Sequence, residues 1–480
     1  MAPLFLLFLI TYVFSAGAHL YSVDELSSYF TTRAIAERGS LNIAYAIPLF
    51  HELGFLEWVP ENVSTYYSAY GVLHASLAVP LYFLGTWLGV VQWKIIGLLY
   101  SPVISAASGC LVYAISRRLA HSRRMSVALS LLYCFATIAW PYAKFFFDVT
   151  TASAMQLASV YFLLDATANR RSTLLSGSFA ALSVLARVTQ ILILPPMIIY
   201  VVFKTRGRLS AKLATIGAFM IPLITGAVLY GYLNSLRLQL SSPLGLLSYF
   251  AASLPPFRLS QLLVGTYGML LSSGPGLFIY TPLCALGLFS LLFSDRWHNW
   301  EGFILFSFFF SNLIFSSLLP FWSGWIAWGP RYLVTSVPYL ILPLAPILHS
   351  IKTSITRTMV LVCATAVGIF SNLMGVLINF LYDFGYLYDI GAVGFRSPNP
   401  IPPETWIPSF SPLRASWDLI WSEKFPACYY PYVPEVFYLK ARYDLYLYDT
   451  YGLYALVFFC AIVLLASSWL VVTVRRNVPD

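Results

Sequence analysis

Residues Tyr451–Val474 read YGLYALVFFCAIVLLASSWLVVTV, an apolar stretch that contains no charged residue. About 20 such residues suffice for a helix to cross the hydrocarbon core of a bilayer, so this stretch predicts a transmembrane helix. The whole chain of 480 residues is 59% hydrophobic and only 10% charged. Soluble globular domains carry about 25% charged residues, which excludes a water-soluble fold. Because backbone polar groups in lipid must be hydrogen-bonded within each segment, we expect an all-α polytopic membrane protein.

The same criterion selects further stretches and predicts about twelve spans in all. These candidate spans are Pro3–His19, Val91–Ile115, Met125–Tyr142, Val149–Ala166, Thr173–Leu185, Thr189–Phe203, Leu213–Leu233, Pro275–Phe293, Phe303–Phe321, Val334–Leu348, Thr358–Leu381 and Tyr451–Val474.

Basic residues gather in one alternate set of loops and at the C-terminal end of the sequence. These segments hold roughly half of the 28 Lys and Arg residues but few of the 19 Asp and Glu residues. Basic residues accumulate on the cytoplasmic side of membrane proteins, so the pattern predicts that both termini are cytoplasmic. The net charge of +9 is then a sign of topology and not of nucleic-acid binding. Counting Tyr70–Leu88 as a span would reverse this arrangement, so we predict an interfacial or re-entrant helix there.

The chain is expected to form a single integral membrane domain, 1–480, with three external regions. These are a first loop with juxtamembrane helices at 20–92, a loop at 234–274 and an aromatic-rich cap at 382–450. The first segment has the alternative of being a cleaved signal peptide, because Ala16-Gly17-Ala18 is typical of a cleavage site. It lacks the basic residues that precede such a peptide's apolar core, which favours a retained span.

Cysteine and histidine residues show no metal or disulfide pattern. Five of the 6 cysteines lie in apolar runs, where packing is their usual role. His19, His51 and His74 lack the spacing of metal ligands, so the sequence assigns them no function.

Asp24 and Glu25 follow the first predicted span directly. A carboxylate at the membrane boundary must be hydrated, paired or bound to a cation. It can act as a general base toward a hydroxyl or as a metal ligand. The structural alternative is that the acidic pair caps the helix expected from Leu26, where negative charge suits the helix dipole.

Asp148 and Arg187 lie at the same predicted membrane boundary. Asp148 lies in a short turn between two spans, where helix capping is the structural alternative to a functional role. Arg187 lies between two short apolar runs and must reach the interface, pair with an acid or bind an anion. An ion pair with Asp148 would satisfy both residues.

Arg331 and Tyr332 follow a tryptophan-rich stretch, again at the external boundary. The planar fork of an arginine suits phosphate, and an adjoining helix N-terminus adds partial positive charge. The tryptophans also fit an interfacial aromatic belt, which is their usual role. Proton-coupled transporters usually carry an acidic residue near the middle of a span, and no predicted span of this chain has one. This favours an enzyme at the external face over a pump.

Several short motifs together resemble the polyprenyl-phosphate-sugar-dependent glycosyltransferases of the GT-C fold, which include protein O-mannosyltransferases and lipid A aminoarabinose transferases. The resemblance covers most of the chain and is weakest after about Leu381. Its motifs are Asp24-Glu25, Thr65–Gly71 with Ala78–Leu81, Asp148, Leu185–Thr189, Leu270–Pro282 and Gly329–Leu333.

The chain departs from this family at two places. Relatives often carry an arginine in the glycine-rich loop, where this chain has Gly274-Pro275-Gly276. Many carry a lysine in the juxtamembrane stretch, where this chain has Ser68-Ala69. Both departures remove phosphate contacts and imply a rearranged donor site.

The resemblance implies a membrane enzyme that transfers a sugar from a polyprenyl-phosphate carrier, with inversion, on the non-cytoplasmic face. Asp24 would be the general base and Arg331 would bind the leaving phosphate. Arg187 would assist Arg331 at the phosphate, and Tyr332 would contact the substrate. Glu25 and Asp148 would position the sugar, the acceptor or a divalent cation, whose involvement the sequence leaves open. The acceptor would be a protein, lipid or glycan; membrane lipids are expected partners and nucleic acids are not. The alternatives are a lipid or polysaccharide transporter (a flippase) and a structural membrane subunit.

Overall fold

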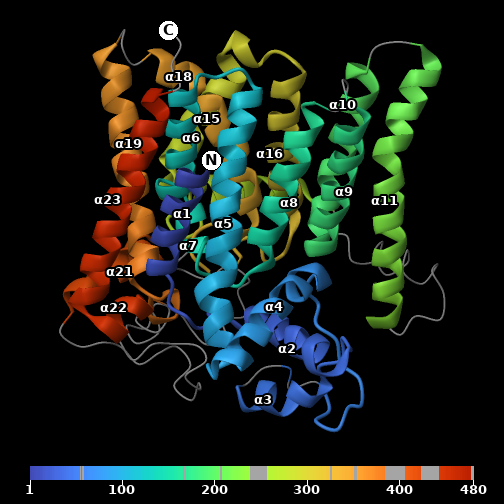
Figure 1. Cartoon of the computed structure of the whole chain (residues 1–480), viewed down its shortest axis with the longest axis vertical. Coiled ribbons are helices and arrows are strands. Elements are labelled where there is room, and N and C mark those ends of the chain that lie inside the picture. Colours follow the sequence, from blue (N-terminus) through green and yellow to red (C-terminus); the bar gives the residue numbers. More distant parts are fainter. Residues whose placement is uncertain are drawn as a thin grey trace.

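The computed structural model describes residues 1–53, 56, 59–165, 169–205, 208–237, 257–324, 327–350, 354–383, 406–422 and 443–476. Within these ranges the chain is helical, and its one extended pairing is an isolated bridge between Asn42 and Tyr67. The helices pack side by side in one bundle, and α2, α3 and α4 lie together at one end of it (Figure 1). This architecture confirms the predicted all-α polytopic membrane fold.

Six helical segments in the described part of the chain are long and apolar enough to cross a membrane. They are α5 (Gln92–Arg118), α11 (Leu209–Arg237), α16 (Trp300–Leu318), the run Arg331–His349, α19 (Ile355–Leu377) and α23 (Leu453–Arg476). Shorter helices within the other expected spans are α1 (Ala2–Phe14), α6 (Arg123–Phe135), α8 (Asp148–Leu163), α9 (Arg170–Ala186), α10 (Leu194–Lys204) and α15 (Pro282–Phe293).

Several expected spans are interrupted, and a proline lies in or close to each interruption described here. The segment 125–142 is divided into α6 and α7 (Ala139–Tyr142), and 275–293 into α14 (Leu277–Tyr280) and α15. The run 331–349 begins with the 3₁₀ turn η4 (Arg331–Ser336) and continues as α17 (Val337–Ile341), the 3₁₀ turn η5 (Leu342–Leu344) and α18 (Ala345–His349). Proline lacks the backbone N–H that an uninterrupted helix requires, so apolar composition predicted the segments but not their breaks.

The helices after the first span form a small layer at the end of the bundle that holds the site. This layer contains α2 (Val23–Arg38), α3 (Ile47–Glu52) and α4 (Val72–Leu88). The Thr32 hydroxyl donates to the carbonyl of Ala75 at 3.0 Å, which ties α2 to α4. The structure therefore places α4 against α2 and beside α5 (Figure 1), and the interfacial or re-entrant position of Tyr70–Leu88 stays a prediction.

Two of the predicted external regions are only partly described. The region 234–274 contains an apolar helix, α13 (Leu259–Leu271), that packs along α16 and that composition did not separate from the loop. Within 382–450, residues 384–405 and 423–442 lie outside the described residues, and α21 (Pro412–Trp421) is described.

The two ends of the described chain lie side by side. The rings of Phe14 in α1 and Phe459 in α23 stack with centroids 4.1 Å apart. The backbone N–H of Tyr446, at the start of α22 (Tyr446–Tyr451), donates to the carbonyl of Ala16 at 3.0 Å. Residues from the C-terminal part of the chain therefore reach the segment that carries Asp24.

Candidate functional site

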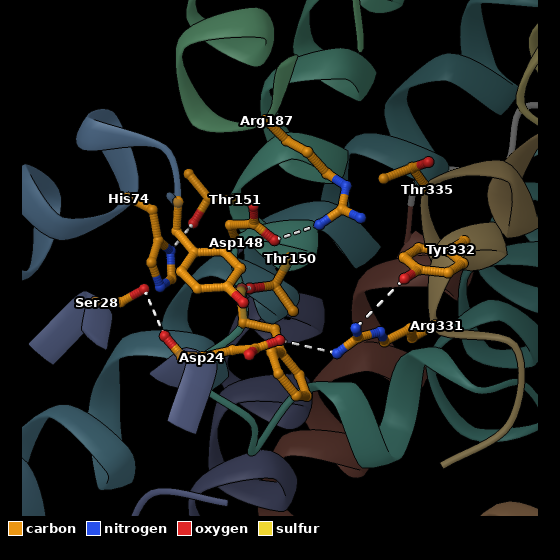
Figure 2. Close-up of polar contacts among 12 residues, drawn as sticks. Asp24, Ser28, His74, Asp148, Thr150, Thr151, Arg187, Arg331, Tyr332 and Thr335 are labelled. Carbon is orange, nitrogen blue, oxygen red and sulfur yellow. Dashed lines mark hydrogen bonds and ion pairs between the residues drawn. The ribbon is translucent and has the colours of Figure 1, made fainter. Parts of the chain in front are cut away.

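A cavity of about 210 Å³ lies where the α2–α4 layer meets the helical bundle. Its walls come from segments that are far apart in the sequence (Figure 2). The lining residues are Asp24, Ser28, Tyr70, Tyr142, Phe146, Phe147, Asp148, Val149, Arg187, Arg331 and Tyr332. Five of the six residues that the sequence proposed as site residues therefore line one cavity.

Asp24 lies in the first turn of α2. The helix begins at Val23 because the Ser22 side chain accepts the N–H of Glu25, so Ser22 performs the capping that the sequence also allowed for Asp24. The Asp24 carboxylate is thus available to other groups. Its Oδ2 atom lies 2.9 Å from Nη1 of Arg331, and its side chain is 27% exposed.

Arg331 is the first residue of η4, and its side chain lies close to Gly324. Gly324 has a φ of +79°, and a Cβ atom there would come within 2.9 Å of Cγ of Arg331. Glycine adopts this left-handed conformation without strain and leaves room for the arginine side chain. Nη2 of Arg331 lies 3.4 Å from the hydroxyl of Tyr332.

Asp148 and Arg187 form a second ion pair in the same cavity. Nη1 of Arg187 lies 2.6 Å from Oδ1 of Asp148, with side chains 18% and 7% exposed. Asp148 is in the first turn of α8, and Arg187 ends α9 in an extended conformation. The Tyr332 ring lies near both cations, 5.7 Å from Cζ of Arg187 and 5.2 Å from Cζ of Arg331 (Figure 2).

Glu25 is placed differently from its neighbour. Its side chain is fully buried, is not part of the cavity lining and accepts the backbone N–H of Tyr21 at 2.9 Å. Burial raises the pKa of the Glu25 carboxyl well above its usual range, although the Tyr21 N–H opposes this shift. The structure thus provides no cavity contact for the predicted substrate role of Glu25.

Aromatic and hydroxyl residues complete the cavity, and the sequence assigned them no role. Tyr70 belongs to the 65–71 motif and lies beside Asp24. Burial, reinforced by the Asp24 carboxylate, raises the pKa of the Tyr70 hydroxyl well above its usual range. Tyr70 therefore remains a hydrogen-bond donor at the wall of the cavity. Ser28, one turn after Asp24, and Tyr142 gave no sequence signal.

His74 holds the backbone segment that leads into α8 and Asp148. Its Nε2 lies 3.1 Å from the carbonyl of Phe146 and must donate to it, so Nδ1, 2.9 Å from the Thr151 hydroxyl, is the acceptor. Burial lowers the pKa of His74 to about 4 and keeps the ring neutral. His74 is thus a positioning residue, and its separation from Phe146 in the sequence hid this role.

A buried ionic cluster lies behind the cavity. Asp444 receives Nζ of Lys144 on one carboxylate oxygen and Nε2 of His19 on the other, each at 2.6 Å. Burial opposes ionisation of Asp444, but Lys144 and His19 hold its pKa well below the usual range. Lys144 also donates to the carbonyl of Val376 at 2.8 Å. The cluster therefore joins the segment before α22 to the turn between α7 and α8.

The described residues show no group of three or more His, Cys, Asp or Glu side chains arranged to hold a metal ion. In the cavity, each of the two carboxylates, Asp24 and Asp148, is paired with an arginine.

The fold and the site thus define a polytopic α-helical membrane protein with a two-acid, two-arginine cavity at one end of its bundle. Residues 77–230 match a family described as dolichyl-phosphate-mannose-protein mannosyltransferase. This match confirms the resemblance noted from the motifs. It covers Asp148 and Arg187 but not Asp24 or Arg331.

Similar folds occur in solved structures of larger proteins. ArnT from Cupriavidus metallidurans, bound to undecaprenyl phosphate, shares 15% identity and a TM-score of 0.48, covering 84% of this chain and 66% of that one. The archaeal oligosaccharyltransferase AglB from Archaeoglobus fulgidus is 12% identical with a TM-score of 0.44, and the match covers 82% of this chain and 58% of AglB. The arabinofuranosyltransferase AftD from Mycobacteria is 14% identical with a TM-score of 0.41, and the match covers 82% of this chain and 29% of AftD. The chain thus spans about two thirds or less of these proteins, and no curated protein matches it significantly.

Proposed function

We propose that the chain is a membrane glycosyltransferase that moves a sugar from a polyprenyl-phosphate carrier to an acceptor hydroxyl. The observation that carries this proposal is the convergence of Asp24, Arg331 and Arg187 on one cavity. A base and two cations are the groups that this reaction requires. The matched family description names a dolichyl-phosphate sugar as donor, in agreement with the proposal.

The reaction is a single displacement at the anomeric carbon. Asp24 accepts the proton of the acceptor hydroxyl, whose oxygen forms the new bond to that carbon. The bond between the anomeric carbon and the phosphate oxygen breaks, and its electron pair stays on the phosphate. One displacement inverts the anomeric configuration. A positioned base contributes roughly 10²–10⁴-fold to the rate of such a step.

The charge change in this reaction suits the two arginines. The donor is a phosphodiester with one negative charge, and the released polyprenyl phosphate is a monoester that carries nearly two at neutral pH. Cations that meet charge as it develops stabilise the transition state more than the ground state. Arg331, with Arg187 across the Tyr332 ring, is placed to meet this additional charge.

Each arginine is paired with an acid in the cavity, so binding of the donor involves an exchange of partners. The donor phosphate takes the place of the Asp24 carboxylate on Arg331, and Asp24 is released toward the acceptor. Asp148 keeps Arg187 oriented and contacts the sugar or a cation. Tyr70, which is partly exposed in the cavity wall, is placed to contact the sugar.

The site is expected on the non-cytoplasmic face, because the basic loops predict a cytoplasmic location for the opposite end. The acceptor class, whether protein, lipid or glycan, is open in this proposal. A transporter is the alternative, but the cavity lies at one end of the bundle and its ionisable groups form an acid–arginine site there (Figures 1 and 2).

Sugar transfer from a synthetic polyprenyl-phosphate sugar by the purified protein tests the proposal. We expect transfer by the wild type and a loss of roughly 10²–10⁴-fold in kcat for Asp24→Asn. Asp295→Asn is the matched control, because the Asp295 side chain is fully exposed and is not part of the cavity. Unchanged turnover in Asp24→Asn would remove this base from the reaction. Lipid flipping without any sugar transfer would favour the transporter.

A further inference from the structure

A second cavity, of about 220 Å³, lies at the far end of α5 from the Asp24 site. Its lining residues are Arg118, Leu119, Ala120, Leu164, Arg296, Trp297, Asn299 and Glu301. α5 begins beside α4 and ends at Arg118, and its 27 residues span about 40 Å. The cavity therefore lies at the opposite end of the bundle (Figure 1), where α5, α8 and α16 meet.

Two arginines of this cavity have hydrogen-bond donors to spare. Arg118 donates from Nη1 to the carbonyl of Tyr161, and its Nη2 lies 3.9 Å from Asp165, beyond hydrogen-bond distance. Arg296 donates from Nη2 to the carbonyl of Leu119 at 2.7 Å. A guanidinium has five N–H donors, so these contacts leave donors on both residues.

The acids near the cavity are already engaged. Glu301 lies 2.6 Å from Nζ of Lys204, and Asp165 accepts the Ser172 hydroxyl at 2.7 Å. The two arginines are therefore only weakly compensated by carboxylates. Further arginines on this face, Arg117, Arg123, Arg124, Arg170 and Arg171, add positive charge around it.

A buried donor in the wall points to a ligand. The Trp297 side chain is 3% exposed, and its Nε1–H has no hydrogen-bond partner among the described residues. A buried donor without an acceptor costs free energy, so an acceptor brought to this nitrogen beside the cavity recovers it.

We propose that this cavity binds a phosphate group at the membrane face opposite the Asp24 site. Tetrahedral phosphate oxygens accept bonds from donors that arrive from different directions, and here Arg118 comes from the end of α5 and Arg296 from the turn Asp295–Trp297. A water molecule occupies about 30 Å³ in the liquid, so the cavity has room for a phosphate and the first atoms of an ester arm. Basic pockets between transmembrane helices on the cytoplasmic side bind lipid headgroups, and inorganic phosphate offers the same chemistry.

The test separates the two sources of phosphate and weakens competing phosphate binding at the Asp24 site. All titrations use the full-length, delipidated protein in detergent. This protein carries Arg331→Ala, so that phosphate binding at that arginine is removed. The probes are inorganic phosphate, short-chain phosphatidic acid and, as a phosphate-free control, the matching diacylglycerol. Thermal stabilisation gives the Kd, and native mass spectrometry counts the bound lipid.

We expect Arg296→Ala to raise the Kd of the bound phosphate compound by about tenfold or more, the loss typical of a charged hydrogen bond. Trp297→Phe keeps an aromatic ring, although a smaller one, and removes the indole N–H, and we expect a smaller increase in Kd with normal folding. Arg171→Ala, an exposed arginine on the same face, should leave the Kd unchanged.

Binding of phosphatidic acid alone would identify a lipid headgroup, and equal binding of inorganic phosphate would identify the free ion; either result supports the site. The proposal is overturned if neither probe binds. It is also overturned if Trp297→Phe and Arg296→Ala both bind as tightly as Arg171→Ala.

Discussion

Asp24 and Arg331 are 307 positions apart in the chain, yet Oδ2 of the aspartate lies 2.9 Å from Nη1 of the arginine. The first belongs to a helix that follows the opening span, and the second to a 3₁₀ turn that begins a later span. Their contact closes one side of the cavity. In the proposed reaction these two residues separate when the donor binds, because the phosphate competes with the carboxylate for the arginine.

Replacement of Arg331 is expected to weaken binding of the polyprenyl-phosphate product. Loss of a charged hydrogen bond costs about 1.5–3 kcal/mol, so Arg331→Ala should raise the Kd by roughly 10- to 150-fold. The Kd of Arg331→Lys should lie between those of the wild type and of Arg331→Ala, because an ammonium is a point charge without the planar fork of a guanidinium. Equilibrium binding of labelled polyprenyl phosphate measures the Kd of each variant. Arg258→Ala, at an exposed position, is the control; normal affinity in folded Arg331→Ala protein would contradict the assignment.

The Asp148–Arg187 pair is expected to show strong coupling in a double-mutant cycle. The two side chains are largely buried, so removal of either leaves a poorly hydrated charge. We expect a coupling free energy of about 1–3 kcal/mol for Asp148→Asn with Arg187→Ala, measured by reversible unfolding in mixed micelles. The exposed Arg414–Asp418 pair is the control and should couple by less than about 0.5 kcal/mol. A coupling free energy between Asp148 and Arg187 as small as that of the control pair would show that the two residues do not depend on each other.

His74 predicts a dependence of stability on acid pH. The unfolded histidine titrates near its ordinary pKa of 6.5, whereas in the folded protein burial lowers the pKa to about 4. Between these values the unfolded chain binds the additional proton, so the free energy of unfolding falls as pH decreases from 6.5 to 4, by about 3 kcal/mol. His74→Gln should flatten this slope relative to His298→Gln, which changes a more exposed ring. A slope that persists in His74→Gln would assign it to another group.

Asp444 is expected to matter for stability more than any surface acid. Asp444→Asn leaves Lys144 buried with a weakened partner, and breaking a buried pair typically costs about 3–5 kcal/mol. The double replacement Lys144→Met with Asp444→Leu should recover part of this loss, because both charges of the Lys144–Asp444 pair are removed. Chemical unfolding in detergent measures both, with Asp449→Asn at an exposed position as the control. If Asp444→Asn and Asp449→Asn unfold alike, the cluster does not stabilise the fold.

The fold was readable from the sequence because apolar composition alone decides which segments can enter a membrane. Asp24, Asp148, Arg187 and Arg331 were identifiable one by one, since charged residues at a membrane boundary need an explanation. Which arginine pairs with Asp24 was not readable, because no periodicity relates positions 307 residues apart. Glu25 was grouped with Asp24, but successive residues on a helix point in different directions, and only the first of them reaches the cavity.

His74, Tyr142 and Asp444 were missed for a related reason. Each acts through a partner distant in the sequence: the Phe146 carbonyl for His74, the cavity wall for Tyr142 and the Lys144 ammonium for Asp444. A neutral histidine in an apolar helix and an aspartate in a tyrosine-rich stretch carry no local pattern that marks them. Their roles become visible only when the packed helices are known.

On the ribosome, Lys144 is synthesised 300 positions before Asp444. At about 5–20 residues per second, the ammonium spends about 15–60 s without its final counter-ion. During that interval the early helices cannot settle around a dry lysine, so they stay partly hydrated until the last segment arrives. Nascent chains stalled before residue 444 should therefore be the ones that membrane quality-control proteases remove most rapidly.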